Sequence, residues 1–230
     1  MRLPSAALAA ATLAAALALV PVASAHGVEK GDQEWIVDNP GPQIGPFLYL
    51  GAKHMVTGYD HLLFLVGVIF FLHRTKDVLV YVSMFTLGHS ATLLFGVLAD
   101  VHVNAFLVDA VIGLSVVYKG FDNLGGFRRL FGRQPDTKAA VLVFGLFHGF
   151  GLATKLQEFE LGRDGLVENI LSFNLGVEIG QFLALGAILL FMTWWRARES
   201  FAKHAFATNT LLMAGGFVLF GYQIAGYLVS

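Results

Sequence analysis

The stretch HMVTGYDHLLFLVGVIFFLH, residues 54–73, decides the fold because it joins an apolar run that could lie in a lipid bilayer to ionisable side chains. Its second half, 62–72, carries no charge, whereas its first half carries His54, Asp60 and His61. An ionised side chain at the centre of a transmembrane helix costs about 2.5–3.5 kcal/mol on insertion scales. The stretch therefore predicts a membrane-spanning segment whose polar residues face a bundle interior and serve a function.

The composition supports a membrane protein. Of the 230 residues, 56% are hydrophobic and 13% are charged, and the mean hydropathy is +0.68. Soluble domains average about 25% charged residues. The net charge of −1 gives no indication of nucleic-acid binding. The chain has no cysteine, so disulfides and thiolate metal sites are excluded and any metal must bind through histidine or oxygen ligands.

Residues 1–25 have the pattern of a secretory signal peptide. Arg2 precedes an Ala/Leu-rich core, and the sequence ASA at 23–25 matches an A-x-A cleavage site. We expect cleavage before His26, outside the cytoplasm; an uncleaved anchor helix is the alternative. The amine and imidazole of an N-terminal His26 together would offer a metal two nitrogen ligands.

The rest of the chain predicts an all-α fold, a polytopic membrane bundle of six helices after a cleaved signal peptide. A transmembrane helix needs about 20 mostly apolar residues. Residues 26–45 form an extracytoplasmic tail that contains Pro40 and Pro42, and 46–230 form the transmembrane domain. The six predicted spans are 47–72, 77–99, 103–121, 139–156, 166–194 and 207–229.

Basic residues predict the orientation, because cytoplasmic loops of membrane proteins are enriched in Lys and Arg. Nine of the 15 Lys and Arg lie in alternate predicted loops, 73–76, 122–138 and 195–206. The tail and the other loops hold only Lys30, Lys155 and Arg163. We therefore expect these three loops to be cytoplasmic and both mature termini to be extracytoplasmic.

The predicted spans contain an unusual set of polar residues. The candidate metal ligands are His54, Asp60, His61, His89, His148 and Glu178, and the supporting polar residues are Thr86, Ser90, Asp109, Asn174 and Gln181. Four candidates, His61, His89, His148 and Glu178, fall near the middle of their spans, whereas His54 and Asp109 lie nearer the outer side. Intramembrane ionisable residues mark ion paths or sites. Gly145 and Gly149 flank His148, and we expect them to let its helix pack closely.

Helix geometry limits how the first span can bind one ion. His54 and His61 are seven positions apart, so they share a face but are separated by about 10.5 Å along a straight helix. Either Gly58 breaks the helix between them, or the two imidazoles lie at successive levels of a path. Asp60 is rotated by about 100° from His61 and is placed to orient an imidazole, as carboxylates do beside metal ligands.

Four motifs carry a family resemblance. HMVTGYDHLLFLVGVIFF, FTLGHSATL, FGLFHGFGLA and FNLGVEIGQ resemble the HupE/UreJ family of bacterial membrane proteins, in particular its HupE/UreJ_2-like branch. The resemblance covers about 45–190. It implies a six-span bundle, nickel permease activity linked to hydrogenase and urease systems, and metal handling by His54, Asp60 and His61. Met55 stands where many members have proline.

The sequence thus predicts a permease for a divalent transition metal. Nickel is the leading candidate, and cobalt, zinc and copper are the alternatives. An intramembrane metal-dependent hydrolase is the second hypothesis, because three histidines and an acid could hold zinc and a water. A metal-sensing or assembly subunit for a metalloenzyme is the third. The expected partners are the lipid bilayer, the metal ion as substrate, and either a second copy of the chain or a metalloenzyme maturation system; no nucleic acid is expected.

Overall fold

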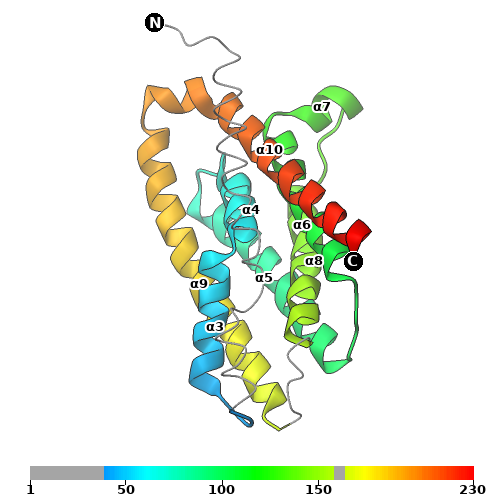
Figure 1. Cartoon of the computed structure of the whole chain (residues 1–230). Coiled ribbons are helices and arrows are strands. Elements are labelled where there is room, and N and C mark those ends of the chain that lie inside the picture. Colours follow the sequence, from blue (N-terminus) through cyan, green and yellow to red (C-terminus); the bar gives the residue numbers. More distant parts are fainter. Residues whose placement is uncertain (1–38, 158–163) are drawn as a thin grey trace, which may run out of the picture.

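The computed structural model describes residues 39–157 and 164–230, and this part of the chain is helical without strands (Figure 1). The predicted signal peptide, His26 and residues 27–38 of the predicted tail lie outside the described residues. The helices are α3 (Ile44–Thr57), α4 (Tyr59–Ile69), α5 (Thr75–Leu98), α6 (Ala105–Asn123), α7 (Gly126–Phe131), α8 (Thr137–Gln157), α9 (Leu166–Arg196) and α10 (Glu199–Val229).

Three of the predicted segments differ from the observed helices. The predicted loop 122–138 contains the short helix α7. The first predicted span, 47–72, consists of two helices, α3 and α4, which meet at Gly58. The predicted loop 195–206 is mostly helical, because α10 begins at Glu199. Glu199 lies in the first turn, where a negative charge complements the helix dipole, and its carboxylate lies 3.6 Å from the Lys203 ammonium.

Four helices are long and apolar enough to cross a membrane: α5, α8, α9 and α10. The remaining long element, α6, has 19 residues but carries Asp109, Lys119 and Asp122. α3 has 14 residues and α4 has 11, so neither helix alone is long enough to cross the membrane. Length and composition by themselves therefore identify four spans in the described part of the chain.

Glycines bring the helices together in three pairs, α3 with α9, α5 with α8 and α6 with α10. A Cβ atom at Gly88 of α5 would lie 2.5 Å from the Leu142 carbonyl oxygen of α8. A Cβ atom at Gly113 of α6 would lie 2.7 Å from the Phe220 nitrogen of α10. Small residues at these positions let the backbones approach closely, which is the usual packing of helices in membranes.

The bundle is apolar outside and holds its ionisable residues inside. Leu190 and Leu228 are 77% and 75% exposed, whereas His89 and His148 are each 1% exposed. The buried ionisable residues of the described ranges are Asp60, His61, His89, Asp109, Lys119, Asp122 and His148. This distribution is the one expected for helices in lipid, where charged side chains face the bundle interior.

One end of the bundle gathers α7, the α4–α5 connection and the turn between α9 and α10 (Figure 1). Arg196 closes this end, because its guanidinium donates to the carbonyl oxygens of Ile69 and Phe70 and so satisfies the last turn of α4. The Arg198 guanidinium lies 4.0 Å from the centre of the Trp194 ring. The three predicted cytoplasmic loops all map to this end.

Candidate metal centre

The break between α3 and α4 creates the centre of the site. Gly58 leaves the helical region with φ −71° and ψ 95°, and its N–H donates to the His54 carbonyl oxygen at 2.8 Å. A Cβ atom at Gly58 would lie 2.9 Å from the Nδ1 of His61, so no larger residue fits there without a shift. The ring centroids of His54 and His61 are 5.1 Å apart, whereas in an unbroken helix the two residues would be separated by two turns. Of the two arrangements left open by the sequence, the helix break is the one observed.

Asp60 holds His61 in one orientation. The Nδ1 of His61 lies 2.9 Å from Oδ1 of Asp60, and both side chains are buried. A carboxylate can only accept, so Nδ1 carries the proton and Nε2 keeps its lone pair. That Nε2 is buried without a hydrogen-bond partner among the described residues. Asp60 also lies in the first turn of α4, where the helix dipole favours a negative charge.

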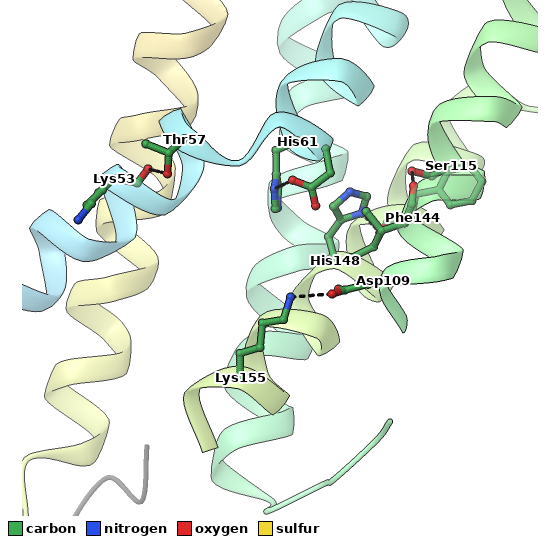
Figure 2. A network of polar contacts seen from close by, with 10 residues as sticks. Lys53, Thr57, His61, Asp109, Ser115, Phe144, His148 and Lys155 are labelled. Carbon is green, nitrogen blue, oxygen red and sulfur yellow. Dashed lines mark hydrogen bonds and ion pairs between the residues drawn. The ribbon is translucent and has the colours of Figure 1, made fainter. Parts of the chain in front are cut away.

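His148 presents a second imidazole to the same place from α8. Its Nδ1 donates to the Phe144 carbonyl oxygen at 2.8 Å, so its Nε2 also keeps the lone pair (Figure 2). One potential ligand atom from each of Asp60, His61 and His148 lies within 4.8 Å of the other two. Nitrogen–metal bonds are about 2.0–2.1 Å long, so small side-chain movements would let one ion contact these three residues.

Two further histidines surround this group. The ring centroid of His61 lies 4.9 Å from that of His148 and 6.0 Å from that of His89. Neither ring nitrogen of His89, nor Nε2 of His54, has a hydrogen-bond partner among the described residues, although all are buried. Unpaired buried polar atoms are costly, and they occur mainly where a ligand, ion or water binds. Four helices, α3, α4, α5 and α8, each contribute one of these imidazoles.

Aromatic rings separate this group from the rest of the bundle. The centroid of Phe85 lies 4.9 Å from that of His148, and the centroid of Phe64 lies 5.6 Å from it. A narrow pocket starts at His61 and continues between Val82 and Val141 toward the end of the bundle that carries α7. Its walls are almost entirely apolar, apart from His61, Gln181 and Tyr81. A metal ion in this environment would bind mainly through imidazole and carboxylate.

Not every predicted ligand joins this group. Glu178 is half-buried on α9 and contributes no atom to it. Gly176 and Gly180 face α3, so Glu178, two positions from each, is turned roughly 200° around the helix and away from α3. Asp109 pairs with Lys155 of α8, Oδ2 to Nζ at 2.7 Å (Figure 2).

The supporting polar residues divide in the same way. Thr86 donates to the Oε1 of Gln181 at 2.9 Å, which links α5 to α9 beside the pocket. Ser90 and Asn174 are half-buried, and the Asn174 side-chain oxygen has no hydrogen-bond partner among the described residues. Thr86 and Gln181 thus connect two helices, and none of these four residues contributes an atom to the ligand group.

Several buried polar contacts have no counterpart in the sequence-based prediction. Lys155 was expected in an outer loop but lies in the last turn of α8. Lys119 and Asp122 form a buried pair of 2.6 Å in α6, although Asp122 was expected in a loop. Asn209 of α10 is fully buried and accepts from Asn123. The i, i+3 spacing of Lys119 and Asp122 was the available signal for that pair.

We predict that Gly149→Ala disrupts this site through packing. The added methyl group would clash with the His89 carbonyl oxygen and with the Thr92 hydroxyl, which itself donates to Leu146 at 2.7 Å. Overpacking of this kind costs about 1–3 kcal/mol. Thermal unfolding in detergent should show a lower transition temperature. Gly186→Ala is the matched control, because nothing lies within 4 Å of its added Cβ, and an equal effect of both changes would contradict the prediction.

The fold and the site define a class of protein: a multi-pass helical membrane protein with an internal histidine and carboxylate site. The chain belongs to the HupE/UreJ family, since the family model described as HupE / UreJ protein matches residues 30–230. This family is associated with nickel or cobalt transport or with urease and hydrogenase maturation, and it is not a known enzyme class. Comparison with curated proteins and with solved structures gave no match.

Proposed function

We propose that this protein is a permease for a divalent transition-metal ion, with nickel as its first substrate. The observation that supports the proposal is the buried group of Asp60, His61 and His148, whose potential ligand atoms lie within 4.8 Å of one another. Neutral imidazole binds nickel, cobalt, zinc and copper, and the carboxylate compensates part of the charge. Family membership favours nickel or cobalt among these ions.

The arrangement of the imidazoles supports stepwise movement of the ion. Transport requires sites that bind the ion but also let it leave, which several adjacent weak sites provide. His54 would receive the ion from the start of the bundle at α3, and His61 and His148 would hold it at the centre. The narrow pocket beyond His61 would then be the path of release toward the end that carries α7.

We further propose that α3 with α4 and α6 cross the membrane together with the four apolar helices, which makes six spans. In the inner membrane, the basic end of the bundle would face the cytoplasm and both mature termini would face outward. The charges of α6 do not oppose this placement, since Asp109 and Lys119 are buried in ion pairs. An ionisable residue paired inside a bundle is tolerated in a membrane.

The alternatives differ in what they do with the bound metal. A sensing or assembly subunit would bind the ion without moving it. This role is the second candidate, because the family is also associated with urease and hydrogenase maturation. An intramembrane hydrolase would retain one zinc with an open coordination position. Metal accumulation inside vesicles separates a permease from both.

The direct test is uptake of nickel by liposomes that contain the purified protein. We expect saturable nickel accumulation that vanishes in protein-free liposomes and is inhibited by cobalt. Binding, measured by calorimetry, should weaken as the pH falls, because protons compete with the metal ion for the imidazole nitrogens. Stoichiometric binding without accumulation would point to the assembly role, and absence of binding to any of the four metals would reject the metal site.

A further inference from the structure

The ion pair of Lys155 and Asp109 lies beside the histidines, and the proposed transport cycle does not explain it. His148, Gly151 and Lys155 follow one another at i, i+3 and i+7 on α8, so they share one face. Asp109 reaches this face from α6, and its Oδ2 lies 2.7 Å from the Lys155 ammonium. The two side chains are only 7% and 14% exposed, respectively.

The Asp109 carboxylate is only half satisfied. Its Oδ1 is buried and has no hydrogen-bond partner among the described residues. Gly151 leaves the space beside this oxygen without a side chain, since a Cβ atom there would lie 3.3 Å from Oδ1. A buried carboxylate oxygen without a donor is energetically costly in a low-dielectric interior. The position is therefore suited to a cation that approaches Oδ1 along the face of α8.

The pair lies on the side from which a cation would arrive. Lys155 is in the last turn of α8, about 10.5 Å along the helix from His148 (Figure 2). Lysine has a long flexible stem and can move its ammonium toward the helix end. Asp109 lies on α6, so the two partners of the pair belong to different helices.

We propose that Asp109 is an outer binding station for the incoming divalent cation, and that Lys155 is an internal cation that occupies this station between transport events. An arriving metal ion displaces the ammonium from Asp109 and then passes to the imidazoles. The ammonium returns when the ion has moved on, so the carboxylate is never left unpaired in the bundle. This inference rests on the proposed metal-transport function.

The inference predicts opposite effects of the two single substitutions on nickel affinity. Lys155→Met removes the competing cation and leaves a negative charge beside the site, so nickel should bind about tenfold more tightly. Asp109→Asn removes the attraction and leaves an unpaired ammonium, so nickel should bind about tenfold more weakly. The double variant should return to within about threefold of the parent, because both charges are gone.

Calorimetric titration of the purified full chain with nickel measures these effects, and uptake by liposomes should show slower release for Lys155→Met. If both single variants weaken binding, the pair is only structural and the inference is wrong. Should Asp109→Asn fail to fold, Lys155→Met alone decides: tighter binding supports the inference, and unchanged or weaker binding overturns it. Lys203→Met is the matched control, since its ammonium pairs with Glu199 at the exposed surface, and it should change the affinity less than about twofold.

The test separates the inference from the function on which it rests. If replacement of His61 and His148 leaves nickel binding intact, the proposed function fails, whatever the Lys155 variant does. If those replacements abolish binding while Lys155→Met does not tighten it in the parent, the metal site stands and the role of Asp109 as an outer station is rejected.

Discussion

Replacing His61 and His148 together with alanine is expected to abolish nickel binding and transport while the protein still inserts and folds. His61 and His148 are two of the three residues of the ligand group, so only Asp60 of that group remains in the double variant. His54 and His89 lie around the group but share no close set of ligand atoms with Asp60, and one carboxylate is a poor site for a transition metal. Either single replacement should lower the affinity about a hundredfold, and Asp60→Asn should lower it about 10- to 100-fold because His61 loses its orientation.

The measurement combines nickel titration in detergent with accumulation in liposomes, and thermal unfolding verifies that each variant is folded. His102→Ala is the control, because His102 is a solvent-facing histidine whose Nδ1 lies 3.1 Å from the Asp100 carbonyl oxygen. If the double variant accumulates nickel, cobalt, zinc and copper as the parent does, the transport function is wrong as proposed here.

His54 tests the consequence of the helix break. In an unbroken helix, His54 would lie two turns from His61, and its loss would slow access without changing the affinity at the centre. Because the rings are 5.1 Å apart, we expect His54→Ala to lower the binding affinity itself. Of the two arrangements that the sequence left open, this result would follow from the break at Gly58 and not from separate levels.

The second large effect is expected from the buried ion pair in α6. The Asp122 carboxylate lies 2.6 Å from the Lys119 ammonium through Oδ2, and it accepts from Gln134 through Oδ1. Removing one partner of a buried pair leaves an uncompensated charge and costs about 3–5 kcal/mol. Asp122→Ala should therefore greatly lower the stability of the bundle, and Lys119→Met should do so as well.

The double variant Lys119→Met with Asp122→Ala should be more stable than either single variant, because neither charge of the pair remains in the interior. Thermal unfolding in detergent measures the three variants. Substitution of Lys203 and Glu199 serves as the control, since an exposed pair contributes about 0–1 kcal/mol. An unchanged unfolding temperature of Asp122→Ala would mean that the pair contributes nothing to stability.

The closeness of three candidate site residues was predictable because they are close in the sequence. His54, Asp60 and His61 stand within one short stretch, and the apolar residues around them exclude an ordinary surface role. His148 lies between two glycines, which indicated close packing, and Gly149 does lie against the backbone of α5. Glu178 was placed with the histidines because it has a matching depth, but depth says nothing about the direction in which a side chain points.

The sequence by itself determined that the protein is helical, where its long apolar segments lie, and that its basic residues gather at one end of the bundle. Hydropathy and charge can be read from each segment alone. It also predicted that His61, His89 and His148 would be buried, since their segments are too apolar to lie in water. All three are buried, whereas His54 is half-buried. The tertiary structure decided which residues meet: the break at Gly58 brings His54 to His61, and the glycine contacts between α5 and α8 bring His89 near His148. It also assigned Lys155 to Asp109, because partners on separate helices are set by the packing of backbones, which no single segment encodes.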